Sequence, residues 1–277
     1  TIKLNAVELK YNYEGEEYIL HLIDTPGHVD FSYEVSRSLA ACEGAILIVD
    51  AAQGIEAQTL ANLYLAMNND LTIIPVINKI DLPNADVEKV TDELVNVLGF
   101  NRDEILLCSG KTGVGVKELL NAIVKRIPAP KEPIDHETKA MIFDSYFDPY
   151  RGVIASVRVF DGKIKKSDTI KMMSTGATYE VVELGVSTPK TKELSELVSG
   201  QVGWINASIK TIDTVKVGDT ITTLSHEAKA PLPGYQPMKP MVYSGLFPIE
   251  PNKFEPLKEA LEKLKLNDAS LEFEPET

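Results

Sequence analysis

Two hydrophobic patterns divide the chain. Up to about residue 128, short and nearly unbroken apolar runs alternate with stripes in which apolar residues recur every three or four positions. Unbroken runs are typical of strands buried on both faces of a sheet. They lie at 44–50, 71–78 and 104–110. Before them, segments 2–13 and 17–23 alternate more regularly around the turn sequence YEGEE and predict a hairpin.

Three helices are predicted in the same part of the chain. The stripe 31–42 has Asp30 in the N-cap position, the stripe 87–98 is closed by Gly99, and the stripe 116–127 stops at a proline. Strands that alternate with helices form parallel sheets covered on both faces, and ligands collect beyond the carboxyl ends of such strands. The first part is therefore expected to be an α/β domain with its binding site at that edge.

The second part of the chain has a β pattern. Short strands separated by turn sequences run from Lys139 to about Thr223 without a helical stripe, which predicts a small β-barrel or sandwich. The similar sequences KSDTI (166–170) and VGDTI (217–221) indicate a repeated turn at which a strand begins. The tail, 241–277, reads as strand, helix and strand, which is too small to stand alone and is interpreted as the start of an α+β domain.

Proline-rich linkers at 127–136 and 231–240 separate these parts. The domains are accordingly expected at 1–128, 137–232 and 239–277.

Composition narrows the function. The chain of 277 residues has a net charge of −13, which argues against a generally cationic nucleic-acid binder. Cys42 and Cys108 lie in apolar surroundings and suggest small core residues in a reducing compartment, not a disulfide framework. The densest apolar run, AILIVDAA, is interrupted by Asp50 and is too short to span a membrane. Five lysines in predicted turns either contact RNA or form a solvated rim: Lys163, Lys165, Lys166, Lys190 and Lys192.

The sequence DTPGH follows the strand 17–23. An aspartate at the carboxyl end of a strand can hold Mg²⁺ directly or through water, which makes Asp24 a candidate ligand. Gly27 permits a tight turn whose backbone N–H can approach a phosphate, and His28 is placed to orient a water. For this motif alone, a surface turn followed by an ordinary histidine is the alternative.

Polar residues also follow the last two predicted strands of the α/β part. After the strand 71–78, the carboxylate of Asp81 can accept two hydrogen bonds from a purine edge that carries N1–H and an exocyclic amine, as guanine does and adenine does not. Asn78 can tie neighbouring loops together, and the stem of Lys79 can lie along the base. After the apolar run EILLC (104–108), the backbone N–H groups of Ser109–Lys111 can meet the base oxygen. An exposed polar loop is the alternative for each motif alone.

Three such motifs in this order resemble a GTPase of the P-loop class, and histidine after DTPG resembles the translational GTPases within it. The stretches SYEVSRSLAACEGAILIVDAAQGIEAQT, FDSYFDPYRGV and KPMVYSGLFPI resemble the elongation factor 4 (LepA) family, and the similarity runs over the whole chain. The short interval between Asp81 and Ser109 favours this type over elongation factor G. The resemblance implies an incomplete P-loop-type α/β GTPase domain, an all-β barrel and the start of an α+β ferredoxin-like domain.

The resemblance also implies ligands and roles. GTP, GDP and Mg²⁺ are the expected ligands, and His28 is the expected catalytic residue, which positions the attacking water. Thr1 in switch I and Asp24, through water, would hold Mg²⁺, and Gly27 would donate to the γ-phosphate. The guanine base would be bound by Asn78, Lys79, Ile80, Asp81, Ser109, Gly110 and Lys111. The family usually has Ser-Ala-Lys at the last three positions, so Gly110 is expected to loosen the loop and lower the base affinity somewhat.

One departure concerns the phosphates. The sequence contains no GxxxxGK[ST] loop, which in the family lies upstream. We therefore expect a central piece that begins inside switch I, lacks the family's carboxyl-terminal domains and does not hydrolyse GTP alone.

For the intact protein, the resemblance implies a monomeric, ribosome-dependent GTPase of translation elongation, with ribosomal RNA and proteins as partners and tRNA contacts through the missing domains. It implies a cytoplasmic location and leaves peripheral association with the inner membrane open. The alternatives are a ribosome-binding piece that does not hydrolyse GTP and another translational GTPase, such as a relative of elongation factor G.

Overall fold

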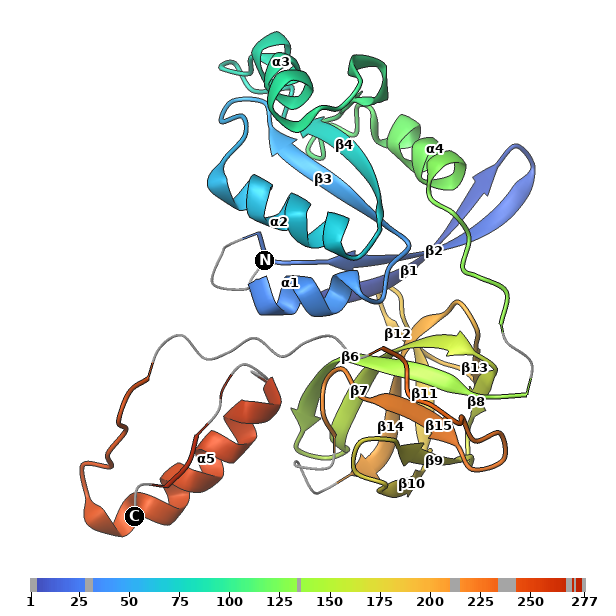
Figure 1. Ribbon diagram of the computed structural model, residues 1–277, viewed down its shortest axis with the longest axis vertical. Helices are drawn as coiled ribbons and strands as arrows, with labels where there is room; N and C mark the ends of the chain where they lie inside the picture. Colours follow the sequence, from blue (N-terminus) through green and yellow to red (C-terminus); the bar gives the residue numbers. More distant parts are fainter. Residues whose placement is uncertain are drawn as a thin grey trace. The chain divides into compact units, whose positions relative to one another are not determined.

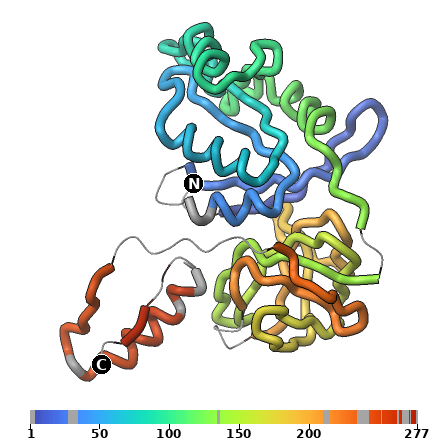
Figure 2. Tube along the Cα trace, in the orientation of Figure 1, coloured from blue at the N-terminus to red at the C-terminus, as the bar shows by residue number. Residues whose placement is uncertain are grey.

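The computed structural model of the protein describes residues 4–27, 32–133, 136–209, 215–233, 243–267, 271 and 273–275. The chain divides into two compact units. The first unit is Leu9–Pro130 with Thr1–Asn5, and the second is Lys131–Thr277 with Ala6–Glu8. Figures 1 and 2 trace the chain through both units, which are described separately below.

The described part of the chain opens with the predicted hairpin, β1 (Asn5–Tyr13) and β2 (Glu16–Asp24). The two residues between the strands, Glu14 and Gly15, both have positive φ, 53° and 90°. Such a turn matches the right-handed twist of the strands it joins. The hydroxyl of Tyr11 donates a hydrogen bond of 2.6 Å to Oδ1 of Asn121, which attaches the hairpin to the helix that carries Asn121.

A parallel three-stranded sheet follows, in the order β3-β4-β5. Its strands are β3 (Gly44–Asp50), β4 (Thr72–Asn78) and β5 (Leu106–Leu107). The helices of the unit are α1 (Ser32–Leu39), α2 (Ala57–Asn68), α3 (Val87–Leu98) and α4 (Val116–Arg126).

The predicted alternation of buried strands and helices is confirmed. Because neighbouring side chains of a strand point to opposite faces, β4 has two apolar faces. Ile77 packs in one cluster with Val90 and Leu94 of α3, whereas Ile74 and Val76 pack in another with Ala122 and Ile123 of α4. Helices therefore cover both faces of the sheet (Figure 1).

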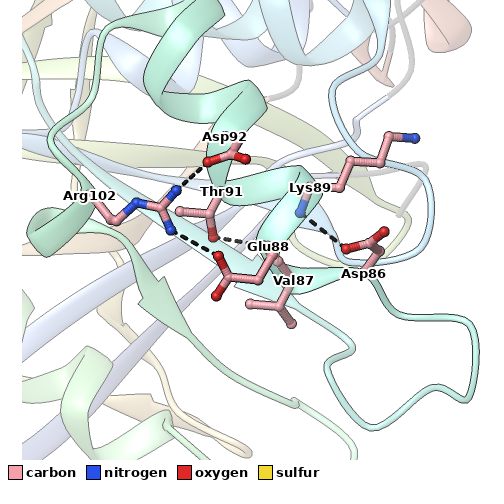
Figure 3. A network of polar contacts seen from close by, with 7 residues as sticks. All are labelled: Asp86, Val87, Glu88, Lys89, Thr91, Asp92 and Arg102. Carbon is pink, nitrogen blue, oxygen red and sulfur yellow. Dashed lines mark hydrogen bonds and ion pairs between the residues drawn. The ribbon is translucent and has the colours of Figure 1, made fainter.

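Local signals fix the two ends of α3. The side chain of Asp86 accepts a hydrogen bond of 3.1 Å from the N–H of Lys89, and Gly99 ends the helix with φ of 75°. Figure 3 shows Asp86 at the N-terminal end of α3. It also shows Arg102 bonded to two carboxylates of the same helix, Glu88 and Asp92. Arg102 belongs to the short 3₁₀ helix η2 (Arg102–Glu104).

The structure adds one helix and shortens two other elements. α2 was not predicted, because apolar residues lie on most sides of the segment 57–68 and obscure the helical period. β5 is only Leu106–Leu107, since β4 pairs with it only at Val76 and Ile77. α1 begins at Ser32 and ends at Leu39, and the predicted cap at Asp30 lies outside the described residues.

The second unit contains the predicted barrel. Eight antiparallel strands run in the order β10-β9-β15-β6-β7-β14-β11-β12, and a ribbon of β8 and β13 adds Ile164 and Leu197 to the same apolar core. The strands are β6 (Lys139–Asp148), β7 (Gly152–Asp161), β8 (Lys163–Lys165), β9 (Thr169–Met172), β10 (Thr178–Glu180), β11 (Glu183–Ser187), β12 (Thr191–Glu193), β13 (Glu196–Val198), β14 (Val202–Ile209) and β15 (Thr220–Thr223). The two similar sequences lead into β9 and β15, which pair with each other.

The tail is helical, and its predicted strands are absent from the described part of 241–277. The predicted helix forms as α5 (Phe254–Asn267) after a 3₁₀ turn η4 (Pro251–Lys253). Residues 243–250 and 273–275 are not strands. A strand requires a neighbour that satisfies its backbone groups, and an apolar–polar alternation does not supply one.

Cys42 and Cys108 are not joined in a disulfide. Cys108 is a buried core residue, as predicted, whereas Cys42 is only half-buried. Within the described ranges, no helix combines the length and the apolar character needed to cross a membrane.

Candidate functional site

The candidate base site lies where β4 and β5 end side by side. The N–H of Cys108 donates to the carbonyl of Ile77 at 2.8 Å, and the N–H of Ile80 donates to the carbonyl of Cys108 at 3.4 Å. These two bonds extend the pairing of the strands into the loops that follow them. The loop after β4 and the loop after β5 therefore form one surface at the carboxyl edge of the sheet.

Asn78 connects the two loops. Its Oδ1 accepts a hydrogen bond of 3.0 Å from the N–H of Gly110 and lies 3.5 Å from the thiol of Cys108. The backbone carbonyl of Asn78 accepts from the N–H of Ala51 at 2.9 Å, which links it to the end of β3 as well. Asn78 thus holds three strand ends together.

Asp81 is fixed by the loop after β5. The buried hydroxyl of Ser109 donates to Oδ1 of Asp81 at 2.7 Å and accepts from the N–H of Thr112 at 3.1 Å. The hydrogen bond from Ser109 lowers the pKa of Asp81, and the positive charge of Lys111 lowers it further. Asp81 is exposed and ionised at neutral pH, so its remaining acceptor sites can receive hydrogen bonds from a ligand.

Lys79 leaves β4 in the left-handed region, with φ of 63°. Its ammonium lies 2.7 Å from Oδ2 of Asp50 at the end of β3. The hydrogen bond from Lys79 and that from the N–H of Ala52 lower the pKa of Asp50, and Asp50 in turn raises the pKa of Lys79. Asp50 was not among the site residues predicted from the sequence. The available signal was a carboxylate that interrupts an apolar strand at the same edge of the sheet.

The DTPG motif lies at the end of another strand, β2. Asp24 is the last residue of that strand and is exposed, Pro26 is buried, and Gly27 is exposed. A Cβ added at Gly27 would have no neighbour within 4 Å. The backbone carbonyl of Gly27 accepts a hydrogen bond of 3.5 Å from the side chain of Asn62 in α2. Two further predicted residues, Thr1 and His28, lie outside the described residues.

The two residues predicted from the sequence to hold a metal, Asp24 and Thr1, carry oxygen donors. Among the described residues there is no group of three or more His, Cys, Asp or Glu side chains that could hold a metal ion. Asp24 offers a carboxylate and Thr1 a hydroxyl, which are the oxygen donors that Mg²⁺ prefers when most of its other ligands are waters and phosphates. The donor types therefore fit Mg²⁺ that is bound together with a nucleotide.

Comparison with known proteins gives the family. The family model for the elongation factor Tu GTP-binding domain matches residues 1–129, and that for elongation factor Tu domain 2 matches residues 152–222. Elongation factor 4 of Staphylococcus carnosus is 62% identical over the whole chain, and that of Exiguobacterium sibiricum is 61% identical. The chain belongs to the translational GTPases of the elongation factor 4 type.

The elongation factor 4 relatives are longer than this chain, which spans 46% of the length of each of the two above. Solved structures agree in fold. A crystal structure of a Thermus thermophilus protein matches with a TM-score of 0.80 and 19% identity, over 98% of this chain and 54% of that one. A bacterial selenocysteine-specific elongation factor matches with a TM-score of 0.65 and 22% identity, over 81% of this chain and 38% of that one. The fold expected from the resemblance, a GTPase domain followed by a barrel, is confirmed.

Proposed function

We propose that the natural protein carrying this chain is a ribosome-dependent GTPase of translation elongation that hydrolyses GTP to GDP and phosphate. The observation that carries the proposal is the ionised carboxylate of Asp81, held by Ser109 at 2.7 Å beside the loop that Asn78 attaches at 3.0 Å. This arrangement offers a guanine base two acceptor positions on Asp81. The family membership of the chain supports the same function.

The choice of base follows from the free energy lost when a polar group has no hydrogen-bond partner. Guanine presents N1–H and an exocyclic amine on one edge, and both can donate to Asp81. Adenine presents an unprotonated N1 there, so Asp81 would lose a partner and keep an uncompensated charge. The backbone N–H groups of Ser109–Lys111 are assigned to the base oxygen, Ile80 to the same base-binding stretch, and the stem of Lys79 to the face of the base.

The phosphate end is assigned to residues of the first strands. Mg²⁺ would be held by Thr1 and, through water, by Asp24, and when bound it neutralises charge on the phosphate oxygens. Gly27 would donate its backbone N–H to the γ-phosphate, and His28 would orient the attacking water when the protein is on the ribosome. For the 277 residues alone we expect no measurable hydrolysis, because their sequence has no GxxxxGK[ST] loop.

The proposal includes an organisation for the chain. Residues 1–128 would bind nucleotide, 137–232 would form the barrel domain, and 239–277 would begin an α+β domain. The barrel would contact ribosomal RNA through its exposed lysines, of which Lys163 also lies 3.6 Å from Glu196. A monomer that works on the ribosome in the cytoplasm is the state we propose.

Base choice is tested with Asp81→Asn in the complete natural protein. Xanthine has a carbonyl where guanine has its amine, and the new amide can donate to it. GTP affinity should fall roughly 30-fold or more, the scale of a lost charged hydrogen-bond pair, and xanthosine triphosphate should be preferred. Asp92→Asn is a matched control, because Asp92 is an exposed carboxylate of α3 whose ion pair with Arg102 lies outside the site. An unchanged preference for GTP in competition binding would remove Asp81 from the base site.

The catalytic role is tested with His28→Ala. If His28 orients water only in the transition state, GTP affinity should stay near the wild-type value while ribosome-stimulated turnover falls by roughly 10²–10³-fold, the scale for one preorganised polar group. The measurement is single-turnover hydrolysis on ribosomes at matched GTP occupancy. Turnover within about threefold of wild type assigns water positioning to another residue.

A further inference from the structure

Three polar residues of the candidate base site, Asn78, Asp81 and Lys79, are each held by a second residue. Gly110 holds Asn78 through its N–H at 3.0 Å, and Ser109 holds Asp81 through its hydroxyl at 2.7 Å. Both of these holding residues come from the loop after β5. Lys79 is held from the opposite side, by the carboxylate of Asp50 at the end of β3.

Asp50 is well placed to act on Lys79. The parallel register of β3 and β4 puts Asp50 opposite Asn78, the residue before Lys79. The Asp50 side chain is 16% exposed against 55% for Lys79, so the carboxylate is the better ordered partner of the pair. Its other oxygen accepts a hydrogen bond of 2.8 Å from the N–H of Ala52, which fixes the orientation of the carboxylate.

The backbone of Lys79 increases the need for such a partner. A non-glycine residue at φ of 63° is in a sparsely populated region, and the conformation directs the chain away from the direction of β4. A lysine stem has four rotatable bonds, and ordering it costs entropy when a ligand binds. A carboxylate that already holds the ammonium removes part of that cost before the nucleotide arrives.

We propose that Asp50 is a positioning residue of the base site, which holds the ammonium of Lys79 so that the lysine stem is ordered to cover the guanine base. The inference rests on the proposed function, since it requires the site to bind a guanine nucleotide. Asp50 itself does not contact the nucleotide. Its effect on nucleotide affinity therefore passes through Lys79.

The test is a double-mutant cycle on GDP affinity in the complete natural protein, with a fluorescent GDP as the probe. Asp50→Asn removes the charge and keeps the acceptor for the N–H of Ala52. It should weaken GDP binding by roughly fivefold, the scale of one half-exposed ion pair. In a Lys79→Ala background, the same change should have no further effect, because the partner through which Asp50 acts is gone. Asp50→Glu, which restores the charge, should recover most of the affinity even if the Asn variant folds poorly.

The outcomes separate positioning from a structural role and from the proposed function. If Asp50→Asn weakens GDP binding equally with and without Lys79, Asp50 acts through its own loop and the inference is wrong. The inference is also overturned if Asp50→Asn binds GDP as tightly as the wild type and the control Asp92→Asn does the same. If the wild-type protein binds no guanine nucleotide, the proposed function fails first and the inference fails with it.

Discussion

Gly115 is the position at which one added methyl group should do most damage to the base site. It lies at the N-terminus of α4, with φ of 76°, in the loop that begins with Ser109. A Cβ built on it would be 1.9 Å from the carbonyl oxygen of Leu107 and 3.0 Å from Cα of Cys108. Those two residues lead directly into Ser109. An alanine therefore requires β5 or the start of α4 to move.

A second glycine of the same loop allows the loss of stability to be separated into a backbone contribution and a steric contribution. Gly113 also has positive φ, 82°, but a Cβ there would meet nothing within 4 Å. Gly113→Ala should cost only the backbone term, about 1 kcal/mol for an alanine in the left-handed region. Gly115→Ala should cost the same term plus about 2 kcal/mol or more, because the overlap is with backbone and not with a flexible side chain. The free energies of unfolding of the two variants should therefore differ by about 2 kcal/mol.

The chain offers separate probes for the two units. Helices α1–α4 belong to the first unit and dominate its circular dichroism at 222 nm, while the single tryptophan, Trp204, lies on β14 in the barrel. Urea unfolding followed by circular dichroism reports mainly the first unit, since α5 of the second unit supplies only a smaller part of the helical signal, and Trp204 fluorescence monitors the second unit. If the two alanine variants differ by less than about 0.5 kcal/mol in the first unit, the contact with Leu107 does not restrain the loop and the reasoning is refuted.

Two further predictions concern polar contacts. The hydrogen bond from Ser109 lowers the pKa of Asp81, so Ser109→Ala should raise that pKa. In the proposed function the base binds the carboxylate form of Asp81, which is lost as pH falls through the pKa, so GDP binding should fail at a higher pH in the variant. Titration of GDP affinity from pH 7 downward measures the two midpoints, and coincident midpoints contradict the prediction. Arg102→Ala should destabilise the first unit by roughly 0.5 kcal/mol at low salt, because Glu88 and Asp92 lose their shared, exposed partner. The loss should nearly vanish at about 1 M salt in thermal unfolding, and an equal loss at both salt concentrations would point to packing instead.

Elements whose structure is decided by a local signal were predictable from the sequence. The apolar stripe 87–98 and the terminal Gly99 predicted the bounds of α3, because both signals lie within the helix or directly after it; the cap at Asp86 was not predicted. The hairpin was predictable for the same reason, since Glu14 and Gly15 set its turn. α2 was missed because a segment that is apolar on most sides shows little helical period, and only its packing on the sheet reveals which face is buried.

Pairing between strands was less predictable. The full length of β5 and the strands of the tail depend on which partner lies alongside, and that information is not local. The sequence could supply the apolar pattern of a strand but not its neighbour.

The candidate site divides in the same way. The sequence by itself determined that Asn78, Asp81 and Ser109 follow buried parallel strands, and parallel strands bring their carboxyl ends to one edge. Only the tertiary structure decided how these residues are held, because Oδ1 of Asn78 had to reach Gly110 and the hydroxyl of Ser109 had to reach Asp81. The ion pair of Lys79 with Asp50 depends in addition on the register that sets Asp50 opposite Asn78. A one-residue shift of that register would reverse the face of each side chain, so a pattern along one strand cannot determine a contact between two.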